Sequence, residues 1–342
     1  MKKKLSITDI ARQLEISITT VSFILNGKAE EKRISKDVTE KVLNLVAELN
    51  YKPNQLAQSL RTGKTHIIGL IVEDIAGSFF ANVARLIEEN AYKNGYRIIY
   101  CSTENRTNKS KELINMFRDR HVDGYIINPS EGIEEDIASL LEEGLPVVLF
   151  DRYLPKLPTN YVVIDNYSGT FNAANHLLQQ GFANIGFITI DSQQTQMEER
   201  YNGYERAMKM HNKKKYVQQI GYYDERESVV QQIISFIKEN PALDAIIFAT
   251  NYLSIFGLEA LKQLKLNIPA DIGVVSFDDH DFFKLYTPTI TAIAQPVEEI
   301  SKQVIKILLN NLTFSGSKWV EQTVVLPSDM IIRESSIRKP EV

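Results

Sequence analysis

Residues 5–27, LSITDIARQLEISITTVSFILNG, decide the fold of the N-terminal part of this chain. Ser6 is followed three residues later by Asp9, a variant of the capping-box spacing that starts helices. Ser17 is a second candidate N-cap and directly follows a three-residue turn at 14–16. The stretch therefore predicts two short helices joined by a tight turn.

The apolar residues of this stretch are spaced so that they meet in one small core. That core would contain Ala11, Leu14, Ile16, Val21 and Leu25. A third helix, expected at about 35–50, would complete it with Val38, Val42, Leu45, Val46 and Leu49. The outward positions of the second helix, Ile18, Thr19, Ser22 and Phe23, are those that enter the major groove in a helix-turn-helix.

Charge supports a DNA-binding head. Residues 1–64 carry twelve Lys and Arg against seven Asp and Glu, a net charge of +5, whereas the rest of the chain carries −9. The whole chain has a net charge of −4. A basic head on an acidic body places the affinity for phosphate where the motif lies.

Three longer segments resemble the LacI/GalR family of bacterial transcription regulators. They are TVSFILNGK at 20–28, RISKDVTEKVLNLVAELNYKPNQLAQSLRTGKTHIIGLIV at 33–72 and VVLPSDMIIRESS at 324–336. The resemblance covers nearly the whole chain and implies a helix-turn-helix head at 1–52 and a hinge at 53–65. The expected DNA-binding residues of the head are Thr8, Ser17, Ile18, Thr19, Thr20, Ser22, Phe23 and Asn26, and those of the hinge are Asn54, Ala57, Leu60 and Arg61.

The hinge is expected to depend on DNA. Its segment 54–60 is about two helical turns long, which is too short for a stable isolated helix. In the family that this chain resembles, the segment folds on the operator, and the paired copies of a dimer lie in the minor groove. Leu60 matches the leucine that is inserted between the central base pairs and kinks the DNA.

Two positions of the head depart from the family pattern. Glu15 stands in the turn where the family usually has glycine. A non-glycine residue at positive φ would cost about 1 kcal/mol, unless the turn has a different geometry. Phe23 stands where the family commonly has an arginine that reads guanine, so we expect the operator to lack that guanine contact.

The remaining chain, residues 66–342, is longer than one typical domain. Its apolar runs do not alternate with polar residues and are separated by helical stretches, which is typical of a parallel sheet covered on both faces. The family resemblance implies a two-lobed α/β body of the type I periplasmic-binding-protein fold. We expect one lobe at 66–165 plus 289–323 and the other at 166–288 plus 324–342, with crossings near Asp165, Pro288 and Thr323.

Polar residues follow several of the predicted strands. In open α/β sheets, ligands bind outside the carboxyl ends of the strands. The residues expected there are Asp74, Asp151, Arg152, Asn251 and Asp278. Carboxylates and arginine suit neighbouring hydroxyl groups, although an Asp at a strand end, such as Asp74 or Asp279, also often caps the next helix.

The resemblance adds further ligand-binding residues. Arg200 and Asp278 match the family's ligand-binding arginine and aspartate, and Phe79, Phe80 and Tyr223 match positions that pack rings against the ligand. Two departures reshape the expected pocket. The family's DISNPFF is DIAGSFF at 74–80, and its common Asn-Asp pair is Asn251-Tyr252.

The sequence therefore predicts a ligand-controlled repressor of carbohydrate-utilisation genes. It would bind a pseudo-palindromic operator as a homodimer and be released by a sugar or sugar derivative. The absence of a heptad extension after residue 336 favours a dimer over a four-chain assembly. A co-repressor-dependent regulator that senses a nucleobase or another metabolite is the alternative. A solute-binding protein and an enzyme are remote alternatives.

The other features of the sequence suit that prediction. The single cysteine precludes a disulfide within one chain, and we find no signal-peptide core and no apolar run of about 18 residues. The expectation is a cytoplasmic, nucleoid-associated protein without a membrane partner. No metal-ligand spacing, GxGxxG, GxSxG or HExxH is present, so no catalytic residue, metal or cofactor is expected.

Overall fold

A computed structural model of the chain describes residues 6–51, 59, 62–313 and 321–338. The chain divides into two compact units, residues 1–65 and residues 66–342. Each unit is described by itself. Four of the expected DNA contacts, Asn54, Ala57, Leu60 and Arg61, lie outside the described residues.

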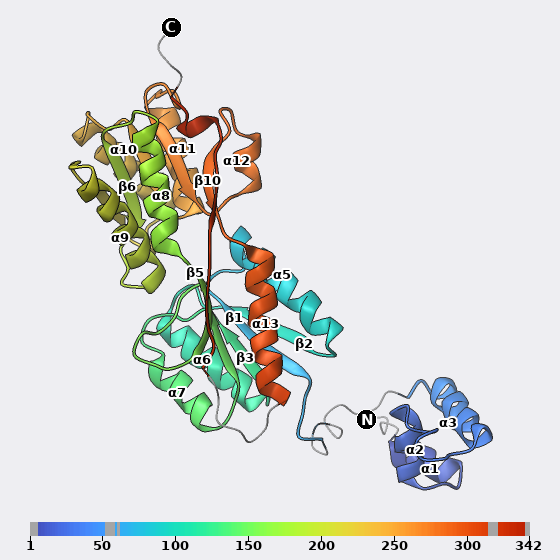
Figure 1. Cartoon of the computed structure of the whole chain (residues 1–342). Coiled ribbons are helices and arrows are strands. Elements are labelled where there is room, and N and C mark those ends of the chain that lie inside the picture. The colour runs from blue at the N-terminus through green and yellow to red at the C-terminus, as the bar shows by residue number, and fades with distance from the viewer. Residues whose placement is uncertain (1–5, 52–58, 60–61, 314–320, 339–342) are drawn as a thin grey trace. The chain divides into compact units, whose positions relative to one another are not determined.

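The first unit contains a compact three-helix domain (Figure 1). Its helices are α1 (Ile7–Gln13), α2 (Ile18–Leu25) and α3 (Lys36–Glu48). The predicted capping box is confirmed, because the Ser6 hydroxyl accepts the Asp9 amide N–H at 3.3 Å and the Asp9 carboxylate accepts the Ser6 N–H at 3.0 Å. The predicted N-cap at Ser17 is confirmed as well, because its hydroxyl accepts the Thr20 N–H at 3.0 Å.

A small core holds these helices together. Its buried members are Ile10, Ala11, Val21, Ile24, Val42 and Leu45. Leu14, Ile16, Leu25, Val38, Val46 and Leu49, all expected in the core, pack against it as partly buried residues. The turn keeps its tight geometry, because Glu15 has a φ of 55° and lies in the left-handed region. The Ile16 N–H then donates to the Ala11 carbonyl at 3.0 Å and closes the end of α1.

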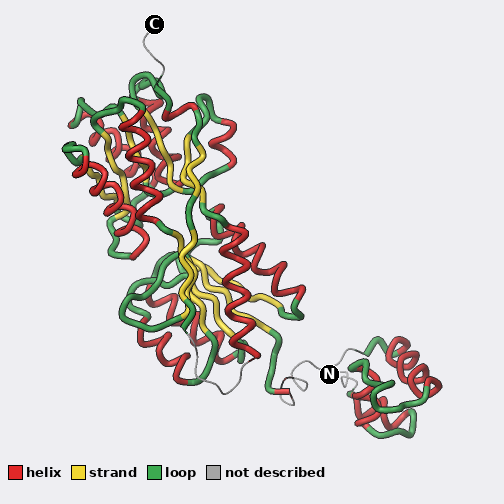
Figure 2. Tube along the Cα trace, viewed as in Figure 1, coloured by secondary structure: helices red, strands yellow, loops and turns green. Residues whose placement is uncertain are grey.

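The second unit consists of two lobes, each built on a six-stranded sheet with helices packed against it (Figure 2). In the first lobe all strand pairs are parallel, in the order β2-β1-β3-β4-β5-β11. Its strands are β1 (Ile67–Val72), β2 (Arg97–Ser102), β3 (Gly124–Ile127), β4 (Val147–Phe150), β5 (Asn160–Ile164) and β11 (Thr323–Leu326). Its helices are α5 (Ser78–Lys93), α6 (Thr107–Asp119), α7 (Glu134–Glu142) and α13 (Val297–Thr313).

The second lobe repeats the same strand order, β7-β6-β8-β9-β10-β12, and only β12 runs antiparallel to its neighbour. Its strands are β6 (Ile185–Ile190), β7 (Tyr216–Ile220), β8 (Ala245–Phe248), β9 (Gly273–Phe277), β10 (Thr291–Ala294) and β12 (Asp329–Ile331). Its helices are α8 (Asn166–Gln179), α9 (Thr195–Met210), α10 (Arg226–Glu239), α11 (Asn251–Gln263), α12 (Asp281–Leu285) and the short 3₁₀ helix η1 (Glu334–Ser336).

The chain passes between the lobes three times, and two crossings differ from the sequence-based expectation. The first lies at Asp165, between β5 and α8. The second was expected near Pro288, but β10 pairs with β9 in the second lobe, so the chain crosses after Ala294. The third was expected near Thr323, but Thr323–Leu326 pairs with β5 in the first lobe, so the chain crosses at 327–328. In both cases an additional strand, β10 in the second lobe and β11 at the edge of the first, displaces the crossing.

Candidate functional site

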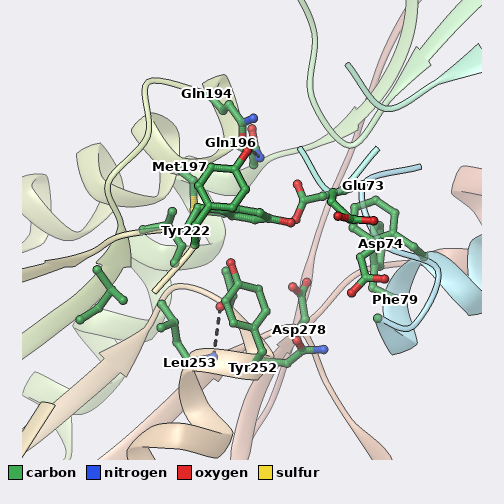
Figure 3. Close-up of a pocket in the computed structure, with 18 of the residues that line it drawn as sticks. Glu73, Asp74, Phe79, Gln194, Gln196, Met197, Tyr222, Tyr252, Leu253 and Asp278 are labelled. Carbon is green, nitrogen blue, oxygen red and sulfur yellow. Dashed lines mark hydrogen bonds between the residues drawn. The ribbon is translucent and has the colours of Figure 1, made fainter. Parts of the chain in front are cut away.

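A cavity of about 400 Å³ lies between the two lobes, where the carboxyl ends of their strands meet. This volume is within the range of small-molecule sites. Its lining includes eight of the nine residues expected to bind ligand: Asp74, Phe79, Phe80, Asp151, Arg200, Tyr223, Asn251 and Asp278. The ninth, Arg152, is buried behind the wall and does not line the cavity. Figure 3 shows how the side chains of both lobes converge on this space.

Asp151 and Asp278 occupy equivalent places in the two lobes. Asp151 follows β4 and Asp278 follows β9, and these strands are fourth in their respective sheets. Both residues have left-handed backbones, with φ of 67° and 66°. Such strained conformations concentrate at binding sites, where they aim a side chain that a relaxed strand end would turn away.

Each of these two carboxylates is held by an amide. The Asn128 side chain donates to Asp151 at 2.9 Å, and the Gln295 side chain donates to Asp278 at 2.6 Å. Burial raises the pKa of Asp151 to about 6, against the opposing effect of Arg152 and Arg200. Burial also raises the pKa of Asp278. The two carboxylates therefore face the cavity with too few hydrogen-bond donors around them. A ligand can supply the missing donors.

Arg200 is positioned by α9, which packs closely on α8 because Gly203 has no side chain at the contact. A Cβ on Gly203 would lie 2.3 Å from the Tyr167 carbonyl. The Arg200 guanidinium donates to the Asn166 side chain at 2.8 Å and to the Ala249 carbonyl at 2.7 Å. It also lies 3.9 Å from Asp278 and 3.6 Å from the centre of the Phe277 ring. Arg200 is thus a rigid cation in the floor of the cavity.

Arg152 supports the site without lining it. Its guanidinium donates at 2.6 Å to both Glu73 and Asn128 in the first lobe, and it donates to Gln194 in the second lobe. The side chain is 2 % exposed. Glu73 lines the cavity, and Asn128 donates to the Asp151 carboxylate. By binding both residues, Arg152 orients groups around the ligand space.

Aromatic rings from both lobes form the apolar walls. Phe79 and Phe80 come from the start of α5, and Tyr222, Tyr252 and Phe256 come from the second lobe. Figure 3 shows the Tyr222 ring directed toward Glu73. Burial, reinforced by Glu73, raises the pKa of both Tyr222 and Tyr252, so their hydroxyl groups stay protonated. Tyr223 lies at the mouth, and its hydroxyl donates to the Asn105 carbonyl at 3.2 Å.

The two segments that contain the departures from the family pattern meet in space. Asn251 donates to the Ser78 hydroxyl at 3.2 Å, which links the second lobe to the first. Asp74 combines two roles, because it lines the cavity and accepts the Ala76 N–H at 2.9 Å. Asp279, by contrast, pairs with Arg333 at 2.7 Å and does not line the cavity.

Several lining residues were not predicted from the sequence. Glu73, Tyr222 and Tyr252 each lie next to a predicted residue in the chain, so the sequence located the segment but selected the neighbouring side chain. Gln194, the N-cap of α9, and Gln196, in the first turn of α9, were missed entirely. Their signal was the polar segment after the apolar run 185–190, which is the same pattern that identified Asp151 after β4.

The expected DNA-reading face of the head contains side chains exposed to solvent and side chains that are hydrogen-bonded within the head. Ile18, 46 % exposed, and Thr19 point into solvent on α2, and Thr8 is exposed on α1. Ser17 and Thr20 are hydrogen-bonded to each other at 2.8 Å within the helix start. Asn26 donates to the Ser22 carbonyl at 2.6 Å.

Phe23 is half-buried on α2, and the Lys32 ammonium lies 5.5 Å from the centre of its ring. Because a phenyl ring carries no hydrogen-bond donor, Phe23 offers only an apolar surface there.

The described part of the chain lacks both a cluster of candidate metal ligands and a helix that could cross a membrane. Its His, Cys, Asp and Glu side chains form no group of three or more that could hold a metal ion. Among the helices of residues 6–51, 59, 62–313 and 321–338, none is both long and apolar enough to cross a membrane.

Two family descriptions match the chain. Residues 6–54 match "Bacterial regulatory proteins, lacI family", and residues 174–336 match "Periplasmic binding protein-like domain". The transcriptional regulator KdgR of Bacillus subtilis (strain 168) is 31 % identical over 98 % of this chain and 100 % of its own length. The transcriptional repressor PurR of Actinobacillus pleuropneumoniae serotype 3 is 26 % identical over 96 % of this chain and 98 % of its own.

Solved structures show the same architecture. The lac repressor dimer bound to operator and the anti-inducer ONPF has a TM-score of 0.86, at 22 % identity over 98 % of this chain and 100 % of that one. A LacI transcriptional regulator of Alkaliphilus metalliredigens QYMF, complexed with D-xylulofuranose, has a TM-score of 0.72, at 25 % identity over 80 % of this chain and 100 % of that one. With a helix-turn-helix head, a periplasmic-binding-protein-like body and regulators rather than enzymes as its relatives, this chain belongs to the lacI family of bacterial transcription regulators.

Proposed function

We propose that the protein is a repressor of carbohydrate-utilisation genes, which binds a pseudo-palindromic operator as a homodimer and is released by a sugar or sugar derivative. It would act in the cytoplasm, at the nucleoid. The observation that carries this proposal is the cavity between the lobes, with carboxylates and a guanidinium in its floor and aromatic rings in its walls.

The chemistry of the cavity suits a sugar. Asp151 and Asp278 can each accept hydrogen bonds from two neighbouring hydroxyl groups, and Arg200 can donate to a ring or hydroxyl oxygen. Phe79 and Tyr222 offer apolar faces for the C–H side of a sugar ring. The complex of the Alkaliphilus metalliredigens regulator with D-xylulofuranose supports the same ligand class.

The head and hinge would recognise the operator. Ile18, Thr19, Ser22 and Phe23 would face the major groove, whereas Asn54, Ala57, Leu60 and Arg61 of the hinge would contact the minor groove, with Leu60 as the wedge. One small head covers only one half-site. Two copies are therefore needed to grip a pseudo-palindrome.

Ligand binding would be coupled to DNA binding through closure of the lobes. A ligand that contacts both lobes binds the closed arrangement more tightly than an open one and shifts the population toward it. In a dimer, that motion would change the spacing of the two hinges on the DNA. The two sites would then be coupled in both directions, because binding linkage is reciprocal.

The test is fluorescence anisotropy of the full-length protein on DNA from its own upstream region, at one fixed salt concentration. Sugars, sugar acids, sugar phosphates and nucleobases are then titrated against the complex. Release of the DNA by a sugar or sugar derivative supports the proposal. Tight DNA binding that no such compound reverses would contradict the sugar-released repressor.

The alternative is a co-repressor-dependent regulator that senses a nucleobase. It is favoured by the 26 % identity to a PurR repressor and by the aromatic rings of Phe79 and Tyr222, on which a flat base could stack. The same titration separates the two functions by sign, because a co-repressor tightens the DNA complex whereas an inducer weakens it.

A further inference from the structure

The cavity is lined by many more acids than bases. The acidic residues of its lining are Glu73, Asp74, Glu104, Asp151, Asp224 and Asp278, whereas the basic ones are Arg106 and Arg200. A ligand must give up much of its water to enter a space of this size, so the sign of the surrounding charge bears directly on which ligands can enter.

Both buried guanidinium groups already have protein partners. Arg152 is bound by Glu73 and Asn128 in the first lobe and by Gln194 in the second. Arg200 is bound by the Asn166 side chain and the Ala249 carbonyl, and the Asp278 carboxylate lies 3.9 Å away. Each buried arginine therefore has a carboxylate of the protein beside it, which offsets its attraction for an anionic ligand.

The third arginine near the site lies at the mouth. The Arg106 side chain is 62 % exposed and lies 3.7 Å from Glu104. Solvent screens so exposed a charge, and its own acidic neighbour offsets it further. Arg106 therefore supplies little attraction for an anion inside the cavity.

Among the lining carboxylates that form no ion pair with a described residue, Asp74 and Asp151 are the two that are not fully exposed, and both accept hydrogen bonds only from neutral donors. Asp74 accepts the Ala76 backbone N–H, and Asp151 accepts the Asn128 side-chain amide. Neither forms an ion pair within 4 Å among the residues that the structure describes. An anionic ligand would meet these two charges after losing its water, and like charges brought together in this way are disfavoured.

We infer that Asp74 and Asp151 make the cavity exclude anionic compounds, so the effector is neutral or carries a positive charge, as a free sugar or an amino sugar does. This inference rests on the proposed function and narrows its ligand class. Sugar acids and sugar phosphates are expected to be rejected although their ring hydroxyls match those of the accepted ligand.

The test compares matched compounds by thermal unfolding of the full-length protein, because a ligand that binds the folded state raises the Tm. The sets are glucose, glucosamine, glucuronate and glucose 6-phosphate; galactose, galactosamine and galacturonate; xylose and xylose 1-phosphate. Buffer and ionic strength are held constant. We expect at least one neutral or amino member to raise the Tm and its anionic counterparts to have no effect.

Operator release by the same compounds separates the two proposals. An anionic compound that raises the Tm more than its neutral and amino counterparts overturns the inference, and if it also releases DNA the proposed function stands. A neutral or amino compound that raises the Tm without affecting DNA supports the inference and contradicts the proposed function. If no neutral or amino member raises the Tm, the inference is wrong.

A variant tests the stated cause. Asp74→Asn removes a charge but keeps the shape, so the affinity ratio of neutral to anionic counterpart should fall at least tenfold. The matched control is Asp119→Asn, an exposed residue at the opposite end of α6 from the cavity mouth, which should leave the ratio unchanged. Equal ratios in the two variants would overturn the role of Asp74.

Discussion

Glu15 holds a backbone conformation that favours glycine, with a φ of 55° in the turn between α1 and α2. The left-handed region costs a non-glycine residue about 1–2 kcal/mol, and the greater freedom of glycine in the unfolded chain offsets part of that cost. We therefore expect Glu15→Gly to stabilise the head by about 0.5–1 kcal/mol. Amide hydrogen exchange in α2 should slow about threefold.

The control for this prediction is Glu40→Gly, at an exposed position inside α3. Glycine there should destabilise the head by about 1 kcal/mol, because α3 requires ordinary helical angles. Faster exchange in the Glu15→Gly variant would mean that the glutamate contributes a contact that outweighs the strain.

A second prediction at the residue scale concerns pH. Burial raises the pKa of Asp151 from 3.8 to about 6 in the folded protein, so the folded state binds a proton more tightly than the unfolded chain. The resulting stabilisation is fully present below pH 3.8 and is lost as the pH rises through about 6. An asparagine at this position cannot ionise, so the Asp151→Asn variant should not lose this stabilisation. The difference in unfolding free energy between the variant and the wild type should therefore shift in favour of the variant by up to about 3 kcal/mol as the pH rises from 4 to 8.

Urea unfolding of both proteins across this pH range measures the difference. Asp281→Asn serves as control, because Asp281 is exposed and its pKa is lowered by the hydrogen bond to Lys284. Its difference from wild type should stay flat from pH 5 to pH 8. A flat difference for Asp151→Asn as well would show that this carboxylate is ionised throughout the range.

At the scale of elements, the segment between β6 and α9 carries several contacts from the second lobe to the first. Gln194 donates to the Asn105 side chain at 2.8 Å and is bound by Arg152, and Ser192 donates to Glu131 at 3.3 Å. Gln194→Ala removes one hydrogen-bond acceptor of the buried Arg152. The loss should destabilise the closed arrangement of the two lobes by about 1–3 kcal/mol. Hydrogen exchange near Asn105 should then accelerate about tenfold.

Gln218→Ala is the matched control for Gln194→Ala. Its side chain lies on β7 and donates only to the neighbouring Gln219 carbonyl among the described contacts, so exchange near Asn105 should stay as in wild type. Unchanged exchange in Gln194→Ala would show that the other inter-lobe contacts suffice to hold the lobes together.

The elements also show what could be predicted from the sequence. The central strands β1, β3, β4, β6, β8 and β9 are largely apolar because both faces of the sheet are covered, and the apolar runs that predicted such a sheet fall on these strands. The edge strand β7 reads YVQQI and is mostly half-buried, so it lacks that signal. Likewise, Thr291–Ala294 and Thr323–Leu326 are short, and only pairing with a distant strand decides their lobe.

The same distinction applies to the site. Asp151 and Asp278 could be predicted because they directly follow buried strands. The contacts of Gln194 with Arg152 and of Asn251 with Ser78 join residues of different lobes. No local sequence pattern predicts how the two lobes pack against each other. Arg152 was expected to touch the ligand, but its charge is used within the protein to hold Glu73 and Gln194.

At the scale of the whole molecule, the DNA head and the sensor body are separate compact units, so their functions should be separable by mutation. Arg200 lies wholly in the body and contacts Asn166, the Ala249 carbonyl and Asp278. Arg200→Ala should abolish the effector response and keep the operator Kd within about threefold of wild type. Because the change leaves Asp278 buried beside no guanidinium, we also expect the body to lose about 3 kcal/mol of stability.

Operator anisotropy with and without effector measures both quantities, at a temperature where the variant is shown to be folded. The control is Arg85→Ala, which removes an exposed arginine that pairs with Glu89 on the surface of α5 and should leave the response intact. An intact response in Arg200→Ala would remove Arg200 from the ligand site. If operator affinity instead falls in step with the response, the head depends on the state of the body even without effector, and the coupling between the two units is stronger than a ligand-driven shift requires.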